Sequence, residues 1–164
     1  MEISEFWRII AAARSARGNG PDDRVEALRE RLAGASSREL QSFQNHYDSL
    51  MARAYRWDLR GAAYIINGGC SDDGFRYFRG WLISEGEEVY HAALADPESL
   101  ARLRRIPLAE NEFFGYVALE LFGEAGDGEF ERDRLTEQAD PAGQPWEEDT
   151  VYDLFPKLSA KYES

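Results

Sequence analysis

The sequence predicts a mainly α-helical protein: one compact multi-helix domain of about seven to nine helices, with a loop-rich acidic C-terminal part. Apolar side chains recur at three- and four-residue steps through most of the chain. Between these apolar stretches lie residue types that favour the start or the end of a helix, such as serine, aspartate, proline and glycine. The 164 residues are 43% hydrophobic and 13% aromatic, which suffices to fill one core. We find no linker and no repeat, so one domain is expected over residues 1–164.

The first three helices are predicted from their ends. Ser4 is expected to cap the first, which ends in the turn-forming residues before Pro21. Pro21 is typical of a first helical position and starts the second helix, which Gly34 ends. Ser36 or Ser37 then caps a third, long helix. Its core positions follow at helical spacing: Leu40, Phe43, Tyr47, Leu50 and Met51.

The centre of the chain is expected to be buried. No breaker follows the third helix, so helix or a tight kink is predicted through Ala54 to Trp57. The segment LRGAAYIIN, from Leu59, is apolar on nearly all sides, which predicts a helix in the middle of the core. The Gly68-Gly69 pair then ends it.

The remaining helices are predicted in the same way. Ser71 begins a helix, and after a short helix Asp96 caps another that starts at Pro97. A further apolar helix is expected over 109–123. The pattern then weakens into loop, and the chain closes with a short helix broken near Pro156.

The net charge of −12 is concentrated in one quarter of the chain. Residues 110–153 hold 14 acidic and 2 basic residues, whereas residues 1–109 hold 16 and 15. We expect 110–153 to form one contiguous negative surface. Its field repels phosphate backbones, which argues against nucleic-acid binding, and favours a basic protein partner. A solvated acidic face that aids solubility would show the same pattern.

Composition also excludes several classes of site. No uncharged apolar window approaches the ~18 residues of a transmembrane helix, so we expect no membrane insertion. One cysteine excludes an internal disulfide, and two histidines exclude the usual zinc cages. No phosphate loop, dinucleotide-binding fingerprint or hydrolase motif is present. We therefore expect a cytoplasmic protein with no cofactor and no bound metal.

The stretch AAYIINGGCSDDGF, residues 62–75, is the place best suited to chemistry or recognition. Its candidate ligand-binding residues, with one that follows, are Tyr64, Asn67, Cys70, Asp72, Asp73 and Arg76. One interpretation is a helix-to-helix corner, in which a glycine of positive φ ends one helix and Ser71 caps the next. The aspartates then lie in the first turn, where at least one meets an arginine, with Arg60, Arg76 and Arg79 nearest in sequence.

The alternative is a small-molecule or metal-dependent enzyme with its site at this corner. The two carboxylates would bind a divalent cation, an arginine or an amine with help from Asn67, His46 or an acidic residue of 110–153. Cys70 precedes a helix N-terminus, an environment that lowers a thiol pKa, and His46 or His91 could activate it as a nucleophile. Against this, no protease signature surrounds the cysteine. The other aromatic candidates are expected in the core: Trp57, Trp81 and the Phe113-Phe114 pair.

Three stretches carry a family resemblance: FWRIIAAAR near the start, WDLRGAAYIINGGCSDDGFRYFRGWLISEGEEVYHAALADPESL at 57–100, and PAGQPWEEDTVYDLFPKLSAKY at 141–162. They resemble the bacterial family catalogued as domain of unknown function 4240, over nearly the whole chain. The central motif GGCSDDGFRYFRGWLI is long and distinctive. The resemblance implies a small cytoplasmic protein and assigns no catalytic residue.

Two functions remain open at this point. The first is a non-enzymatic interaction or regulatory module, comparable to an immunity protein, that presents its acidic 110–153 surface to a basic partner. The second is the enzyme with its site between Asn67 and Asp73. The contacts of the two aspartate carboxylates distinguish them. Arginines and backbone N–H groups indicate a structural corner, whereas free oxygens in a pocket indicate a binding site.

Overall fold

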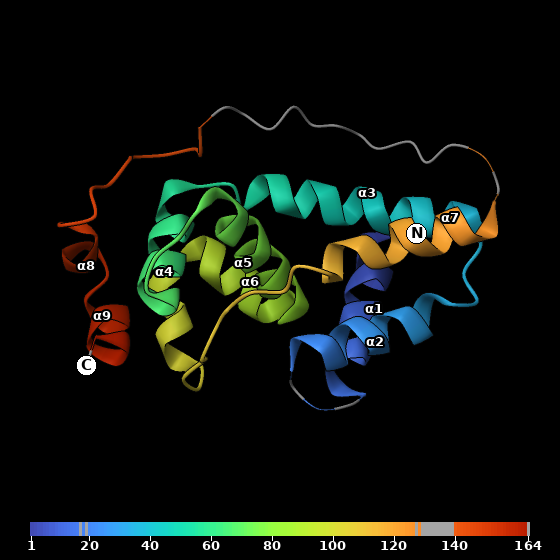
Figure 1. Cartoon of the computed structure of the whole chain (residues 1–164), viewed down its shortest axis with the longest axis horizontal. Helices are drawn as coiled ribbons and strands as arrows, with labels where there is room; N and C mark the ends of the chain where they lie inside the picture. Colours follow the sequence, from blue (N-terminus) through green and yellow to red (C-terminus); the bar gives the residue numbers. More distant parts are fainter. Residues whose placement is uncertain (17, 19, 127, 129–139, 164) are drawn as a thin grey trace.

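The computed structural model describes residues 1–16, 18, 20–126, 128 and 140–163 (Figure 1). Within these residues the chain is helical and contains no strand, which confirms the mainly α-helical class. In chain order the elements are α1 (Ile3–Ser15), α2 (Pro21–Leu32), α3 (Ser37–Arg53), α4 (Trp57–Asn67), α5 (Asp72–Ser84), α6 (Glu87–Ala95), the 3₁₀ helices η1 (Pro97–Arg102) and η2 (Phe114–Tyr116), α7 (Val117–Ala125), α8 (Val151–Leu154) and α9 (Pro156–Tyr162).

The helices form two groups along the long axis of the molecule (Figure 1). Helices α1, α2, α3 and α7 pack together in one group, and α4, α6, η1, α8 and α9 pack together in the other. Helix α5 contacts both, through α1 and α3 on one side and α4 and α6 on the other. The core therefore runs through both groups, and α5 lies at their junction.

Aromatic side chains dominate this core. Those that are fully buried are Phe6, Phe43, Phe75, Phe78, Tyr90 and Phe114. Helix α4 is buried on most sides, as its apolar sequence predicts. Its Gly61 faces the C-terminal segment, where a Cβ would lie 2.6 Å from the ring of Phe155. The Trp146 indole, next to this point, donates to the carbonyl oxygen of Trp57 at 2.6 Å. The C-terminal segment is thus held against α4.

The predicted helix ends are largely confirmed where they depend on nearby residues. Pro21 is the first residue of α2, and Pro156 is the first residue of α9. The Ser36 hydroxyl caps α3, and the Asp96 carboxylate caps η1. In each case the signal acts within one helical turn.

The predicted start of α1 is wrong. The helix begins at Ile3, and the preceding residue Glu2 makes no side-chain capping bond. Met1 explains the earlier start, because its carbonyl oxygen lies 2.8 Å from His46 Nε2 and also accepts from the Ser42 hydroxyl. Contacts with α3 therefore hold the chain in place at Met1. The helix can then begin before Ser4, which does not act as its cap.

Between α3 and α4 the chain makes the tight kink, not a continuous helix. Arg56 is extended and forms an isolated parallel bridge with Ala142. The N–H of Trp57 donates to the Ala142 carbonyl at 2.9 Å. At the end of α3, the Arg79 guanidinium donates to the Met51 carbonyl at 2.9 Å. Groups distant in sequence thus satisfy the backbone where the helix breaks.

The predicted helix over 109–123 is wrong in its first part, because helical structure begins only at Phe114. The Ala109 N–H donates to Asn67 Oδ1 at 2.7 Å, and the Asn67 amide donates back to the Ala109 carbonyl at 3.2 Å. The Asn111 N–H donates to the Tyr77 carbonyl at 2.9 Å. These bonds keep the segment non-helical along α5.

None of the helices in the described ranges has the length and apolar character needed to cross a membrane.

Candidate functional site

The corner between α4 and α5 has the predicted backbone. Gly68 and Gly69 have φ of 73° and 139°, in the left-handed region that favours glycine. The N–H groups of both donate to the carbonyl of Tyr64, which closes α4. The Ser71 hydroxyl accepts a bond from the Gly74 N–H at 3.0 Å and caps α5. The structural corner is therefore confirmed.

Both aspartates of the corner meet an arginine, as the corner interpretation predicts. Arg60 Nη1 lies 3.0 Å from Asp72 Oδ1, and its Nη2 donates to the carbonyl of Cys70 at 3.1 Å. Arg76 Nη1 lies 3.7 Å from Asp73 Oδ1, one helical turn away. The side chains of Asp72 and Asp73 are 91% and 70% exposed. Both carboxylates are therefore largely exposed to solvent, and each pairs with a different arginine.

Cys70 and the two histidines have separate contacts. Burial raises the pKa of the Cys70 thiol to about 11, so it stays protonated near neutral pH. His46 is bonded to the carbonyl of Met1, and the His91 ring packs edge-on against Trp7. Within the described ranges, no three His, Cys, Asp or Glu side chains are grouped so as to hold a metal ion.

Two of the candidate residues turn away from the aspartates. Asn67 is occupied on both its donor and its acceptor atoms by Ala109. Tyr64 packs edge-to-face against Trp146 and Tyr152, with ring centroids 5.3 and 6.2 Å apart. Arg60 thus contacts both Cys70 and Asp72 at the corner. Asn67 and Tyr64 instead contact residues outside the corner.

The segment that begins at Ala109, which Asn67 holds by two hydrogen bonds, forms a surface that was not predicted from the sequence. The Tyr77 hydroxyl on α5 donates to Glu112 Oε1 at 3.2 Å. Phe113 and Tyr116 follow, with exposed fractions of 55% and 36%, and their rings meet edge-to-face at 6.5 Å. Only Phe114 of the Phe113-Phe114 pair enters the core, so the expectation that both are buried is wrong for Phe113.

Like charges gather beside these rings. Burial, with the nearby charge of Glu112, raises the pKa of the Glu110 carboxyl. Burial and the same Glu112 charge also raise the pKa of Tyr77, to which Asp73 and Tyr116 contribute less. A Glu110 oxygen lies close enough to α5 to contact a Cβ added at Gly74, at 3.4 Å. We name this the acidic-aromatic surface: Asp73, Tyr77, Glu110, Glu112, Phe113 and Tyr116.

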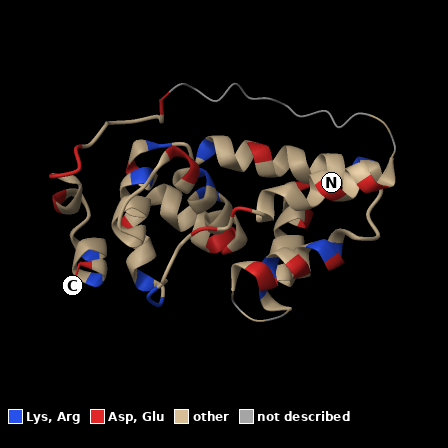
Figure 2. Cartoon of the chain, in the orientation of Figure 1, with Lys and Arg blue, Asp and Glu red and all other residues tan. Residues whose placement is uncertain are grey.

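The acidic segment 110–153 is divided by the fold. Glu120 and Glu124 lie on α7, at one end of the molecule, whereas the acids before and within α8 lie at the opposite end beside α4 (Figure 2). Residues 127 and 129–139 lie outside the described ranges. The acids that are described therefore do not form the single contiguous face expected from the sequence. Those of the acidic-aromatic surface form one group of their own.

Comparison with known proteins gives one family. No curated protein and no solved structure matches the chain significantly. The family model described as "Protein of unknown function (DUF4240)" matches residues 1–125, which include the corner and the acidic-aromatic surface. The resemblance noted at 141–162 lies beyond the matched residues. Because the match spans most of the chain, the protein belongs to the DUF4240 family.

Proposed function

We propose that the protein is a non-enzymatic interaction module that binds a basic protein partner through the acidic-aromatic surface. The observation that supports this most directly is the exposure of Phe113 and Tyr116 beside Glu110 and Glu112. Protein interfaces are enriched in aromatic side chains, which provide contact area, and their charged rims select the partner.

The backbone that carries the aromatic part of the surface is anchored on both sides. Asn111, itself buried, donates from its backbone to α5 and from its side chain to the Pro21 carbonyl at 3.3 Å. The neighbouring Phe114 is buried in the core and anchors the other side of the exposed Phe113. A pre-formed surface costs less conformational entropy when it binds than a flexible one does.

The charge of the surface suits a cation. Glu110 and Glu112 repel one another in the free protein, which is part of the reason why the pKa of Glu110 is raised. An arginine or lysine of a partner placed between them would relieve this repulsion. The partner's side chain would also find the Tyr116 and Phe113 rings within reach for cation–π contact.

The corner supports the alternative function less well. Its two aspartates already pair with arginines, and its cysteine has a raised thiol pKa. The residues that would perform acid–base or nucleophilic chemistry are thus not poised for it. The corner instead sets the position of α5, on which Asp73 and Tyr77 are presented.

Affinity capture with matched variants tests the proposal. The wild-type protein and the double variant Glu110→Gln/Glu112→Gln are immobilised and exposed to native cytoplasm, and bound proteins are identified by mass spectrometry. A second bait carries Phe113→Ser. We expect the wild type to hold a basic protein that both variants lose. Raising the salt from about 50 to about 500 mM should release it, because the Debye length falls well below ~10 Å.

The control is Glu87→Gln/Glu88→Gln on α6, which changes the net charge by the same amount at another exposed position. It should retain the partner. Equal capture by all baits, or capture that salt does not weaken, would contradict the proposal. Metal analysis of the same preparations tests the alternative. Stoichiometric metal that is lost in Asp72→Asn would favour the enzyme.

A further inference from the structure

A basic surface lies where α9 packs against η1 and the loop that follows it. Residues 99–109 and 154–162 contain three arginines and two lysines and no acidic residue, although the whole chain has a net charge of −12. In Figure 2 the blue segments of α9 and of this loop lie at the same end of the molecule. We name this the basic surface: Arg102, Arg104, Arg105, Leu108, Lys157 and Lys161.

The fold uses two of these basic side chains to join the loop to α9. Arg105 Nη1 donates to the Lys161 carbonyl at 2.6 Å, and its guanidinium lies 5.1 Å from the centre of the Tyr162 ring. Lys161 Nζ donates in turn to the Ala101 carbonyl at 3.0 Å. The other three basic side chains are exposed and take part in none of the ion pairs between described residues: Arg102, Arg104 and Lys157.

The basic surface and the acidic-aromatic surface lie at the two ends of one segment, residues 102–116. Hydrogen bonds at Ala109 and Asn111 hold the middle of this segment against α4 and α5. Figure 2 shows the segment blue after η1 and red before η2. Five residues separate Arg105 from Glu110, so their Cα atoms lie within about 18 Å of one another. The two surfaces are therefore neighbours of opposite charge.

Both surfaces also expose apolar side chains. Leu108 is 51% exposed on the basic surface, and Phe113 is 55% exposed on the acidic-aromatic surface. Apolar contact area surrounded by charges is the composition of a protein interface. The net charge of −12 also repels nucleic acids and anionic membranes, which argues against either as the ligand of the basic surface. An acidic protein surface suits it better.

We infer that the basic surface binds the acidic-aromatic surface of a second copy of this chain, in a two-fold symmetric dimer. A two-fold axis between two neighbouring surfaces of opposite charge places each of them on its opposite in the partner copy. The spacing between the surfaces fits without adjustment, because it is the same in both copies. Arg102 and Arg104 would then face the glutamates of the acidic-aromatic surface, whose aromatic rings can also contact guanidinium groups.

This dimer would cover the surface to which we assign a basic partner. Dimer formation and partner binding therefore exclude one another, and this one consequence rests on the function proposed above. The surfaces are small, so we expect a transient dimer with a Kd of about 10–100 µM. A partner that binds more tightly than this would displace the second copy.

Sedimentation velocity of the purified full chain over a range of concentrations tests the inference. We expect a dimer that forms with rising concentration at about 50 mM salt and dissociates at about 500 mM, where the Debye length is well below ~10 Å. The charge-reversed variants Arg102→Glu/Arg104→Glu and Glu110→Arg/Glu112→Arg should each raise the Kd about tenfold or more, because each places like charges opposite one another.

An equimolar mixture of the two charge-reversed variants gives the most specific readout. In the first variant both surfaces are acidic, and in the second both are basic. Each variant therefore repels its own copies and attracts the other variant at both contacts. We expect the mixture to regain the dimer that neither variant forms alone. Thermal unfolding shows whether each variant is folded, and the neutral forms Arg102→Gln/Arg104→Gln and Glu110→Gln/Glu112→Gln, which should also weaken the dimer, replace one that is not.

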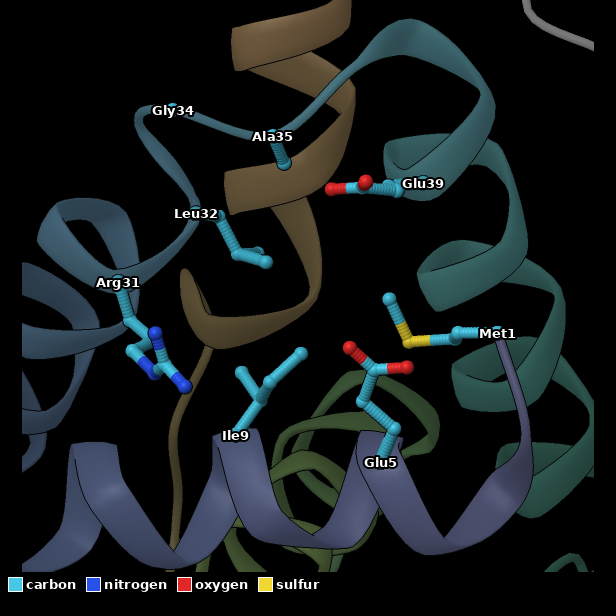
Figure 3. A pocket seen from close by; sticks show the side chains of 8 residues that line it. All are labelled: Met1, Glu5, Ile9, Arg31, Leu32, Gly34, Ala35 and Glu39. Atoms are coloured by element: carbon cyan, nitrogen blue, oxygen red, sulfur yellow. The ribbon is translucent and has the colours of Figure 1, made fainter.

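The control is Arg8→Glu/Arg31→Glu, which reverses two exposed arginines on α1 and α2. Arg31 lines a separate pocket between α1, α2 and α3 and lies outside both surfaces (Figure 3). This variant should dimerise like the wild type.

A wild-type chain that stays monomeric at about 500 µM and low salt would overturn the inference. So would folded charge-reversed variants that stay monomeric when mixed, or a dimer that neither variant weakens. Sedimentation measures self-association of the purified chain, whereas the capture experiment identifies a different protein. Either proposal can therefore fail while the other stands.

Discussion

At the residue scale, the polar side chains of the corner stabilise it unequally. The Ser71 hydroxyl satisfies a backbone N–H of α5 that would otherwise lack a partner. Asp72 and Asp73 remain 91% and 70% exposed, so water screens their ion pairs with the arginines. Most of the stabilisation at this point is therefore expected from the cap.

Substitutions at the corner should show this difference. Ser71→Ala is expected to lower the free energy of unfolding by about 1 kcal/mol through loss of the cap. Asp72→Asn and Asp73→Asn should each change it by less than about 0.5 kcal/mol. Urea denaturation measures all three, with Ser49→Ala on the exposed side of α3 as the control. An aspartate variant of normal stability that no longer captures the partner would make the corner part of the binding site.

Cys70 gives a prediction about pH. Burial raises the pKa of its thiol from 9.0 to about 11. The unfolded chain therefore loses this proton at lower pH than the folded protein does. The resulting contribution to stability is complete below pH 9.0 and decreases as the pH rises toward about 11. Thiolate absorbance, measured against Cys70→Ser, should show a midpoint near 11, and alkylation should be slow at neutral pH. Rapid alkylation with a thiol pKa below about 7 would indicate a reactive cysteine instead.

At the scale of the elements, α5 packs tightly against its neighbours at Gly80. A Cβ at this position would lie 2.9 Å from the carbonyl oxygen of Asn111 and 3.0 Å from the hydroxyl of Tyr47. The Asn111 oxygen belongs to the backbone, so it cannot turn aside as a flexible side chain could. This contact sets how closely the segment before Phe114 lies against α5.

Gly80→Ala should therefore destabilise the protein. The clash is expected to cost about 1–3 kcal/mol, which exceeds the gain of up to about 1 kcal/mol from alanine's better helix propensity. Gly123→Ala on α7 is the matched control, because no heavy atom lies within 4 Å of its added Cβ. It should leave stability unchanged or raise it by up to about 1 kcal/mol. Thermal unfolding of both variants checks this, and a stabilised Gly80→Ala would mean that the segment is not fixed here.

At the scale of the whole molecule, a buried ion pair joins α2 to the end of α5, the helix at the junction of the two helix groups. Arg24 on α2 donates to Glu85, just after α5, with Nη1 and Oε1 2.8 Å apart. Both side chains are about 95% buried, and Arg24 also donates to the Ser84 hydroxyl at 3.0 Å. Arg14 of α1 meets the other Glu85 oxygen at 3.3 Å. Among the described residues, Arg24 Nε is a buried donor without a partner.

Removing one member of this pair should be costly. Glu85→Ala is expected to lower the free energy of unfolding by about 3–5 kcal/mol, because it leaves the Arg24 charge buried and uncompensated. The double variant Arg24→Leu/Glu85→Leu should cost less than the single one, since neither charge remains. Glu88→Ala, exposed on α6, serves as the control. Guanidinium denaturation gives the values, and a loss below about 1 kcal/mol for Glu85→Ala would show that water reaches the pair.

The sequence by itself determined the helical class, the buried character of α4 and the features that act within a turn or two of the chain. These include the glycines and the Ser71 cap of the corner, Ser36 ahead of α3, and Pro21 at the start of α2. Such signals are readable because a cap or a left-handed glycine acts on neighbouring backbone groups.

Only the tertiary structure decided which backbone groups form hydrogen bonds with residues that are distant in the sequence. Ala109 lies 42 residues from Asn67, and their two hydrogen bonds replace the helix that the apolar pattern predicts there. This exchange exposes Phe113, brings Glu112 to the Tyr77 hydroxyl with Glu110 near Glu112, and so forms the acidic-aromatic surface. Periodicity reports which residues a helix would bury, but long-range hydrogen bonds and packing determine whether the helix forms.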